Sequence, residues 1–394
     1  GYYQGGCSRN LNGGERGNRL KFAVLGAGLM GRSAVYDFAH NEDVTEVVVA
    51  DYELARAKEV AERYGNGKTR AVQLDVSDGA ALRDLLKECV AALGAVSYKY
   101  NEAISQAAIE TKTHYVDLGG NNTVVEAQFA LSDKAKEADI ALVPDCGIAP
   151  GAVGIFAASC IERQPEAHSV RIRVGGLPKN PEPPLNYQVV FSAEGLINEY
   201  KEPTICLKDG KVKEVPTLGE LEYLTFPEPF GELEAFNTSG GVSTLPHTLK
   251  DKVQNIDYKT MRYKGHCHIV RALFALGLAD EEPETAAGKE YIPRKVLEHQ
   301  IVKTLGGNEP DVILALIEAE GPEGKFAYRI IDHLDEQTGL SAMARCTSFP
   351  AAIIAHMLAS GAVSDRGTLH QELSIPPTKF IEEFRKRGIK VEEL

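Results

Sequence analysis

Short apolar runs alternate with segments of helical periodicity along the first 150 residues. The runs are rich in Val, Ile, Leu and Ala, which is typical of strands buried on both faces of a parallel sheet. The predicted strands cover residues 22–25, 44–51, 71–75, 90–96, 114–120 and 140–151, the last ending in a Gly/Pro turn. Helices are predicted between them over residues 53–64, 79–86, 102–110 and 127–138. This alternation predicts an α/β domain with a doubly wound parallel sheet.

Strand signals dominate after residue 151, often separated by turn residues. They cover residues 170–174, 187–191, 204–207, 212–215, 221–225, 233–236, 256–263, 312–320 and 326–333. Helices are predicted over residues 154–162, 347–361 and 376–386. The pattern predicts a second, α+β domain with a mixed or antiparallel sheet over residues 151–346. Residues 20–150 and about 347–394 are expected to form the first domain.

Length, charge and cysteine content restrict the class of protein. A chain of 394 residues is too long for one core and favours two domains. The net charge of −13 argues against nucleic acid or anionic membrane partners, because both require a basic surface. No run of 18 apolar residues is present, and seven cysteines without a CxxC pair favour reduced thiols in the cytoplasm. Residues 1–19 lack the apolar core of a signal peptide and are interpreted as a disordered extension, a tag or a miscalled start.

A glycine-rich turn follows the first predicted strand. Gly26 permits the turn, Gly28 allows a pyrophosphate to approach the backbone, and Gly31 allows the helix to lie close to the strand. Asp51 ends the second strand, twenty positions after Gly31, where a carboxylate binds ribose hydroxyls and repels a 2′-phosphate. The pattern predicts a Rossmann-type domain that binds NAD rather than NADP. The alternative is a doubly wound domain with an empty crevice.

The remaining predicted cofactor contacts come from the same turn and from the ends of neighbouring strands. We expect them at Leu29, Met30, Asp75, Val76 and Ser97, with Asp75 and Val76 beside the adenine. Asp75 has an alternative interpretation as an acid that caps the following helix.

Three proton-handling candidates follow predicted strands. Tyr98 comes after the fourth strand, Asp117 after the fifth and Asp145 after the sixth, so they converge on the crevice where a nicotinamide would lie. They are the predicted catalytic residues. The alternative is that the two acids cap the turns that follow them.

Polar residues of the second domain are suited to a small charged substrate. The loop 236–244 offers Thr238, Ser239 and Ser243, and Arg262 is suited to clamp a carboxylate. Glu194, placed at the end of the predicted strand 187–191, is expected to hold an ammonium group. The alternatives are a solvated hairpin and a surface ion pair.

The segment 265–268 carries two histidines and a cysteine. Alternation on a strand would place His266 and His268 on one face, but a zinc site needs a second ligand cluster, so no metal is expected. His266 is predicted to line the substrate pocket instead. Cys146 lacks a neighbouring basic residue that would activate it as a nucleophile.

Several motifs resemble the saccharopine dehydrogenase-like amino-acid dehydrogenases, and the resemblance runs from about residue 20 to the C-terminus. The motifs that carry it lie at 26–31, 116–120, 144–151 and 174–178. Those at 183–187, 191–195, 233–241 and 258–266 more narrowly resemble the lysine 6-dehydrogenases. Such enzymes oxidise the ε-amine of L-lysine with NAD.

The resemblance implies NAD-dependent oxidative deamination of L-lysine to its 6-semialdehyde with release of ammonia. It also implies a second domain that binds substrate and supports a homo-oligomer, a dimer or higher. Similar saccharopine reductases carry an arginine where Glu194 stands, and an acid there would repel their glutamate arm. The alternatives are a saccharopine dehydrogenase that acts on a secondary amine and a non-enzymatic NAD-binding protein.

Overall fold

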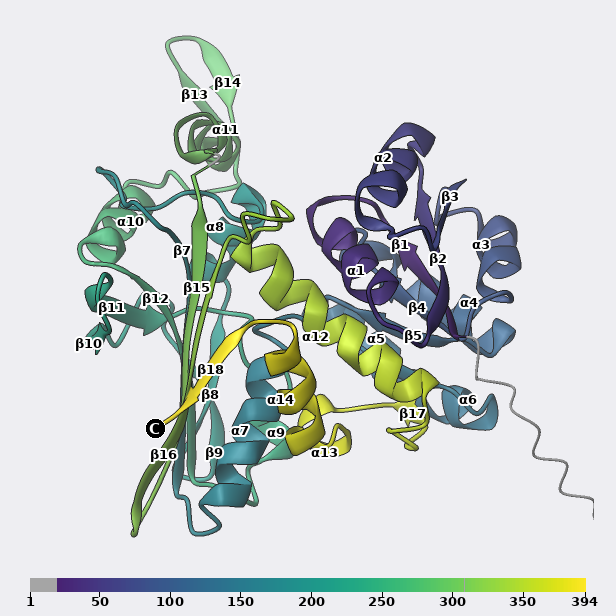
Figure 1. Cartoon of the computed structure of the whole chain (residues 1–394). Coiled ribbons are helices and arrows are strands. Elements are labelled where there is room, and N and C mark those ends of the chain that lie inside the picture. The colour runs from purple at the N-terminus through teal and green to yellow at the C-terminus, as the bar shows by residue number, and fades with distance from the viewer. Residues whose placement is uncertain (1–19, 308) are drawn as a thin grey trace, which may run out of the picture.

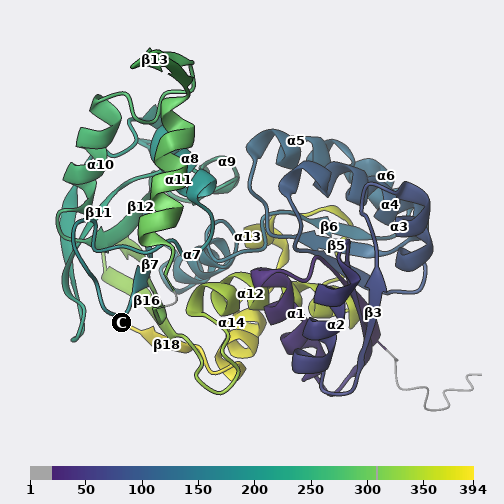
Figure 2. The ribbon, with the colours of Figure 1, turned by 90° about the horizontal axis from the view of Figure 1, so that it is seen from above.

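The computed structural model of the protein describes residues 20–307 and 309–394, so the predicted extension at 1–19 lies outside the described residues. Two large sheets lie side by side, and the long helix α12 (Ala342–Ala359) runs between them (Figures 1 and 2). One sheet is parallel and the other is mixed. The predicted fold class is confirmed.

The parallel sheet has seven strands in the order β17-β6-β5-β4-β1-β2-β3. Alternate residues of β1 pack into different layers: Phe22 and Val24 face α1 and α12, whereas Ala23 and Leu25 face the side of α3 and α4. Burial of both faces explains the continuous apolar runs in the sequence. The strands are β1 (Leu20–Leu25), β2 (Val44–Asp51), β3 (Thr69–Gln73), β4 (Ala91–Gly94), β5 (His114–Asp117), β6 (Ala141–Val143) and β17 (Gly367–Thr368).

The helices of this half connect successive strands. Helix α3, for example, begins directly after Asp78, whose side chain accepts the N–H groups of Ala80 and Ala81 as an N-cap. The helices are α1 (Leu29–Ala39), α2 (Leu54–Tyr64), α3 (Gly79–Leu86), α4 (Asn101–Thr111), α5 (Asn122–Ala130) and α6 (Ser132–Glu137), with a short 3-10 turn at Tyr98–Tyr100 before α4.

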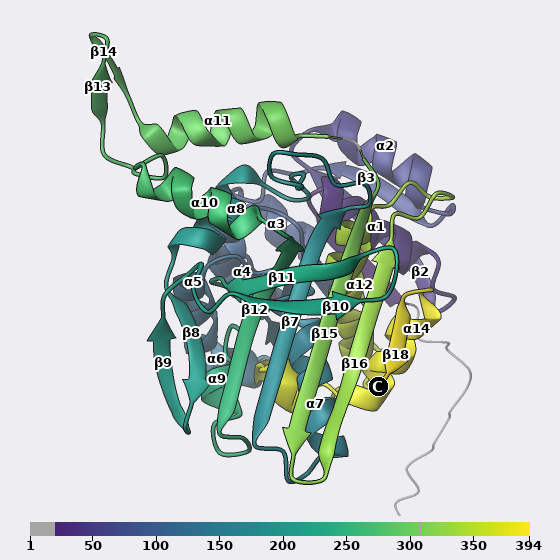
Figure 3. The ribbon, with the colours of Figure 1, turned by 90° about the vertical axis from the view of Figure 1, so that its left-hand side faces the viewer.

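The second sheet has the path β10-β11-β12-β7-β15-β16-β18, with β8 and β9 joined to it through β12 (Figure 3). Its central strand, β7, pairs in parallel with β12 and antiparallel with β15. Helix α7 (Ala152–Arg163) leads into this sheet from the first. The strands are β7 (Ser169–Pro178), β8 (Thr204–Lys208), β9 (Lys211–Val215), β10 (Glu222–Phe226), β11 (Gly231–Asn237), β12 (Asn255–Tyr263), β15 (Asp311–Gly321), β16 (Gly324–His333) and β18 (Lys390–Glu393).

A small hairpin of β13 and β14 projects from the second sheet beyond α10 and α11 (Figures 1 and 3). None of these four elements is evident from the apolar pattern of the sequence. Their bounds, with those of the remaining helices, are α8 (Ala193–Lys201), α9 (Leu245–Thr248), α10 (His266–Ala275), β13 (Glu284–Ala286), β14 (Lys289–Tyr291), α11 (Pro293–Leu305), α13 (Gln371–Ser374) and α14 (Pro377–Lys386).

Helix α12 is the core helix shared by the two sheets. It begins five residues before the predicted start at 347, because the Ser341 hydroxyl accepts the N–H of Ala344 as an N-cap. Gly361, at a φ of +75°, follows its last turn. Among the described residues, α12 alone has the length and hydropathy of a membrane span, and 78% of that span is buried in the fold. Burial of this kind is ordinary for the core helix of a folded domain.

Two predicted elements are wrong. Residues 187–191 form no strand, because their polar groups bond to the end of α11 and the segment after it: the N–H of Val189 donates to the Leu305 carbonyl and the Gln188 amide to the Glu309 carbonyl. The predicted helix 127–138 is two helices, α5 and α6, which meet at Leu131. The division into domains stays a prediction, since the C-terminal segment adds β17 to one sheet and β18 to the other.

Candidate active site

The glycine-rich turn between β1 and α1 is closed on its inner side and open at Gly28. Gly26 has a φ of +100°, and a Cβ added there would lie 2.5 Å from the carbonyl oxygen of Ala95. A Cβ on Gly31 would collide with the carbonyl oxygen of Gly26, whereas a Cβ on Gly28 would meet no atom within 4 Å. The free space over Gly28, at the start of α1, therefore fits the pyrophosphate of a dinucleotide.

Asp51 lies at the end of β2, buried beside this turn. Its carboxylate accepts the N–H of Ala27 at 2.8 Å and that of Glu53 at 2.9 Å, and Arg56 lies 3.7 Å away. Asp51 thus braces the glycine-rich turn while it keeps further lone pairs for ribose hydroxyls. On the other side of the turn, the Ser348 hydroxyl of α12 donates to the carbonyl of Met30 at 2.8 Å. The residues present fit a nicotinamide dinucleotide.

The outer predicted cofactor contacts lie at the surface. The Asp75 carboxylate accepts the hydroxyl and the N–H of Ser77, which lower its pKa. Its alternative interpretation as a helix cap is wrong, because Asp78 caps α3. Val76 is half-buried and Ser97 is exposed, at the start of the 3-10 turn. Leu29 is half-buried in the first turn of α1.

Asp117 and Asp145 lie together at the carboxyl ends of β5 and β6. Asp117 accepts the Gln128 amide at 2.7 Å, the N–H of Gly119 at 2.8 Å and the N–H of Asp145 at 3.4 Å. Burial raises the pKa of Asp117 to about 6, and these donors partly offset the rise. With three donors, the Asp117 carboxylate is largely occupied.

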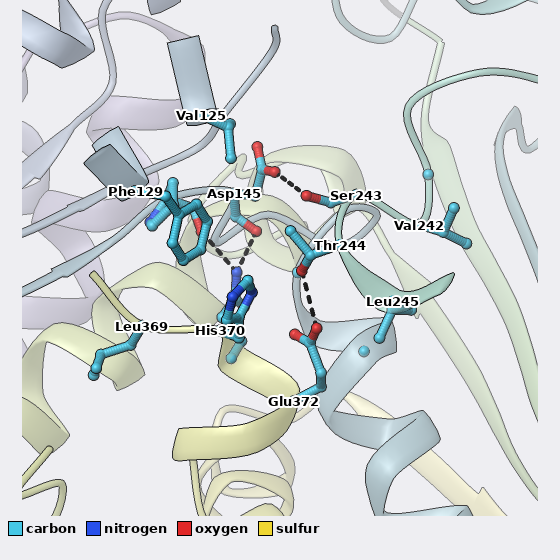
Figure 4. Close-up of a pocket in the computed structure, with 15 residues that line it drawn as sticks. Val125, Phe129, Asp145, Val242, Ser243, Thr244, Leu245, Leu369, His370 and Glu372 are labelled. Atoms are coloured by element: carbon cyan, nitrogen blue, oxygen red, sulfur yellow. Dashed lines mark hydrogen bonds between the residues drawn. The ribbon is translucent and has the colours of Figure 1, made fainter. Parts of the chain in front are cut away.

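Asp145 is the less occupied of the two carboxylates. Among the described residues, its side chain accepts one hydrogen bond, from the Ser243 hydroxyl of the second half of the chain (Figure 4). Burial raises the pKa of Asp145 to about 7, and the Ser243 bond opposes that rise. The backbone of Asp145 has a φ of +60°, a left-handed conformation that is strained for a residue with a side chain. Strained residues of this kind cluster at functional sites.

Figure 4 shows the surroundings of Asp145, a small cavity of about 20 Å³. Thr244 donates to Glu372 at 2.9 Å, and the Gln371 amide donates to the carbonyl oxygen of Asp145 at 2.6 Å. The loop after β11 and the segment around α13 are therefore joined by hydrogen bonds next to Asp145. Tyr98, the third predicted catalytic residue, is 38% exposed and lies over Gly120, and it is not among the residues that line this cavity.

A larger cavity of about 190 Å³ lies between the two halves, next to the glycine-rich turn. The lining residues from the side of the parallel sheet are mostly apolar, whereas those from the side of the mixed sheet include the polar groups Glu199, Tyr258, Thr260 and Arg262. The lining residues are Met30, Leu118, Gly147, Ile148, Ala149, Pro150, Val174, Gly176, Phe191, Glu199, Tyr258, Thr260, Arg262, Met343 and Thr347. In the sequence, Leu118 directly follows Asp117, and Gly147 lies two positions after Asp145.

Arg262 and Glu199 are the charged residues of this lining. The Arg262 guanidinium donates from Nε to the Tyr200 hydroxyl at 2.9 Å and from Nη1 to the Met261 carbonyl at 2.9 Å. It also stacks over the ring of Tyr187 at 4.7 Å. Its Nη2 lies 3.6 Å from the Glu199 carboxylate. Burial raises the pKa of Glu199 to about 7, and Arg262 partly offsets the rise.

His266 does not line the cavity but lies behind Arg262, with Tyr200 between them. It begins α10 and does not belong to a strand, so His266 is buried while His268 is exposed. Within the described residues no cluster of three or more His, Cys, Asp or Glu could hold a metal ion. Burial raises the pKa of the Cys146 thiol.

The remaining predicted substrate residues are not among those that line this cavity. Thr238 is buried and shares a 2.6 Å hydrogen bond with Thr260, which itself lines the cavity. Ser239 donates its N–H to the carbonyl of Glu199 at 2.9 Å. Glu194 is exposed in the first turn of α8, outside the cavity, so its placement at a strand end is wrong.

Two family profiles match almost the whole described chain. The "Saccharopine dehydrogenase NADP binding domain" matches residues 22–143, and the "Saccharopine dehydrogenase C-terminal domain" matches residues 147–389, more than half of the chain. The chain belongs to the saccharopine dehydrogenase family. Residues 22–143 therefore form a nicotinamide-nucleotide-binding domain of this family. The choice between NAD and NADP stays a prediction.

Relatives within and around the saccharopine dehydrogenase family differ in their named substrates. An NADP-linked, L-glutamate-forming saccharopine dehydrogenase of Pyricularia oryzae is 26% identical, and the match covers 75% of this chain and 65% of that relative, less than two thirds of its length. A carboxyaminopropylagmatine dehydrogenase of Synechocystis is 22% identical over 94% of this chain and 96% of its own.

Solved structures share the fold of this family member. The apo saccharopine dehydrogenase of Saccharomyces cerevisiae has a TM-score of 0.77 at 21% identity, covering 95% of this chain and 99% of the yeast chain. A homospermidine synthase of Legionella pneumophila in complex with NAD has a TM-score of 0.68 at 12% identity, covering 96% and 92%. At these identities the likeness concerns the fold alone.

Sequence reasoning missed Glu199, Tyr258 and Thr260, which line the cavity with Arg262. The last two could have been found, because alternation on the predicted strand 256–263 places them on the same face as Arg262. Glu199 had no comparable signal. It lies on α8, and the segment before α8 was interpreted as a strand that ended near Glu194.

Proposed function

We propose that this protein oxidises the ε-amine carbon of L-lysine with NAD and releases the 6-semialdehyde and ammonia. The observation that carries the proposal is the cavity between the glycine-rich turn and the second sheet. It joins apolar walls from the nucleotide-binding half to the single Arg262–Glu199 pair of the other half. An aliphatic chain with a charged head group matches this arrangement.

The position of the cavity supports chemistry beside the nucleotide. Met30 of the glycine-rich turn and Leu118 after β5 line it, so the reacting carbon can lie at the crevice where ligands bind in α/β sheets. Met343 and Phe191 add apolar surface that excludes water from the reacting end. A bound NAD supplies the acceptor for two electrons and one hydrogen.

The substrate nitrogen must lose a proton before the carbon can be oxidised. We assign this proton to the Asp145 carboxylate, because its pKa of about 7 matches the task and Ser243 alone donates to it among the described residues. Asp145 lines the adjacent smaller cavity, and Gly147, two positions later, lines the substrate cavity. The Cε–H bond then breaks, its hydrogen leaves with both electrons, and the nitrogen lone pair closes a C=N bond. Water adds to this imine carbon, and ammonia departs.

A second candidate is the cleavage or formation of saccharopine, a secondary amine. The names of the fungal relatives favour it more directly than they favour lysine oxidation. Saccharopine carries three carboxylates, whereas Arg262 is the single cationic side chain among the described residues that line the cavity. The cavity lining therefore supports the smaller, amine-ended amino acid.

Incubation with NAD or NADP, and with either lysine or saccharopine, tests the proposal. We expect reduced nucleotide and free ammonia from lysine and NAD. Reduced nucleotide from saccharopine, with glutamate as a product and no ammonia from lysine, establishes the second candidate instead. Nucleotide binding without reduction by any amino acid indicates a non-enzymatic NAD-binding protein.

A further inference from the structure

We propose that Glu199 and Arg262 together bind the α-ammonium and the α-carboxylate of the substrate, so that the site selects α-amino acids over simple amines and diamines. This inference deepens the proposed function and rests on it for the identity of the reacting end. It assigns Glu199 a role in substrate selection and not in proton transfer at the reacting carbon.

Arg262 is held so that part of its guanidinium remains available. Nε is bonded to Tyr200 and one N–H of Nη1 to Met261. Among the described residues, the other N–H groups of Arg262, on Nη1 and Nη2, have no acceptor within hydrogen-bonding distance. Arg262 is 3% exposed, yet it lines the cavity, so a carboxylate that enters can accept two parallel hydrogen bonds from it.

Glu199 faces the same point of the cavity from α8. Its side chain is 32% exposed and its carboxylate lies 3.6 Å from Nη2 of Arg262, which is an ion-pair separation without a direct hydrogen bond. The backbone around it is fixed, because its carbonyl accepts the N–H of Ser239 and the Asn198 side chain accepts Nη2 of Arg294 at 2.5 Å. The Glu199 carboxylate is thus a positioned acceptor for an ammonium group.

The spacing of the two charges decides what they bind. An α-amino acid carries its ammonium and carboxylate on one carbon, a few ångströms apart. Its carboxylate can therefore contact Arg262 while its ammonium contacts Glu199. A diamine offers no partner for Arg262, and an amino acid without the α-amine offers none for Glu199. The apolar walls opposite the pair accommodate the aliphatic chain, which directs the far end of the substrate toward Leu118 and Met30.

Calorimetric titration of three probes into the full chain, with and without NAD, tests this assignment. The probes are norleucine, which has the head group but no ε-amine; aminocaproate, which lacks the α-amine; and cadaverine, which lacks the carboxylate. We expect norleucine to bind best. Glu199→Gln should weaken norleucine about tenfold or more and leave aminocaproate unchanged, whereas Arg262→Met should weaken both.

Glu194→Gln is the matched control, because it makes the same change on the same helix at the surface and should alter none of the three affinities. Equal binding of norleucine by the Glu199→Gln variant and the unchanged protein overturns the inference. Weaker turnover of aminocaproate by Glu199→Gln also overturns it, since that result marks Glu199 as the proton acceptor.

The outcomes separate this inference from the proposed function. If lysine is not oxidised but norleucine shows the expected pattern, the proposed reaction is wrong and the head-group assignment holds. If lysine is oxidised but neither Glu199→Gln nor Arg262→Met changes the affinity for norleucine, the proposed reaction holds and the head-group assignment is wrong. Should Arg262→Met not fold, the comparison of norleucine with aminocaproate on Glu199→Gln decides alone.

Discussion

The hydroxyl of Tyr200 donates a hydrogen bond to Nε2 of His266, 2.9 Å away. The direction follows from the other ring nitrogen: Nδ1 lies 3.0 Å from the Leu185 carbonyl, which can only accept, so Nδ1 carries the hydrogen and Nε2 the lone pair. Burial, and then the charge of Arg262, lower the pKa of His266 to about 3, so the ring stays neutral. The Tyr200 oxygen is thereby left to accept from Nε of Arg262.

The hydrogen bonds from Arg262 to Tyr200 and from Tyr200 to His266 hold the Arg262 guanidinium in place without adding a charge. Tyr200→Phe removes the acceptor from Nε and leaves the Met261 bond and the Tyr187 stacking intact. We expect KM for lysine to rise about tenfold with a smaller change in kcat, because a hydrogen bond to a charged group is lost. Steady-state kinetics check this. An unchanged KM would show that Arg262 needs no support from Tyr200.

The protonation of Asp145 should set the pH dependence. A carboxyl whose pKa is about 7 is protonated below that pH and cannot accept the substrate proton, so kcat should rise with pH and level off above about 7. Asp145→Asn should lower kcat about a hundredfold or more at every pH. The measurement is the pH–rate profile of each protein with lysine.

Ser243→Ala provides a sharper comparison, because it leaves the Asp145 carboxylate present. The Ser243 hydroxyl lowers the pKa of Asp145, so its removal should move the rise in kcat to higher pH while the plateau is kept. A profile that does not move would place the titrating group elsewhere.

Titration of Glu199 should appear in KM. Burial raises its pKa to about 7. The groups that face it are Arg262, which stays charged, and Tyr187, Tyr200 and Tyr258, whose pKa values are also raised so that they stay neutral. Below about pH 7 the protonated carboxyl loses its charge toward the α-ammonium. KM for lysine should therefore increase as the pH falls, while KM for aminocaproate stays flat.

Gly28 offers a test of the nucleotide site that does not disturb the fold. A Cβ there meets no atom within 4 Å, so Gly28→Ala should melt at the same temperature as the unchanged protein. The methyl group should nonetheless obstruct the pyrophosphate and weaken NAD about tenfold or more. Fluorescence titration with NAD, together with thermal melting, checks both. Undiminished NAD binding would place the nucleotide elsewhere.

The central strands of the parallel sheet could be predicted from sequence because strands such as β1 and β2 are apolar and buried on both faces, whereas the two-residue edge strand β17 carries no such pattern. The glycine-rich turn and Asp51 were found for a similar reason, since the backbone conformation itself requires Gly26 and Gly31. The segment 187–191 has strand-like composition too. Its partners lie at the end of α11 and just after it, more than a hundred residues away, and no local pattern reveals that pairing.

The candidate site was predicted in part for the same physical reasons. Arg262 was found because it lies on a recognisable strand. The sequence pattern predicts a strand before Glu194 and no helix over α8, so it favours Glu194 over Glu199; only the helix shows which acid faces the cavity. His266 was expected to touch substrate, and instead it supports Arg262 through Tyr200. Relationships of this kind depend on contacts between elements distant in sequence.

Lysine labelled with deuterium at its ε-carbon tests the central claim most directly. The account predicts that deuterium from the ε-carbon appears in the reduced nucleotide, one atom for each ammonia released, while lysine labelled at the α-carbon transfers none. Transfer from the α-carbon, or no transfer from either position, would contradict the oxidation of the ε-amine carbon.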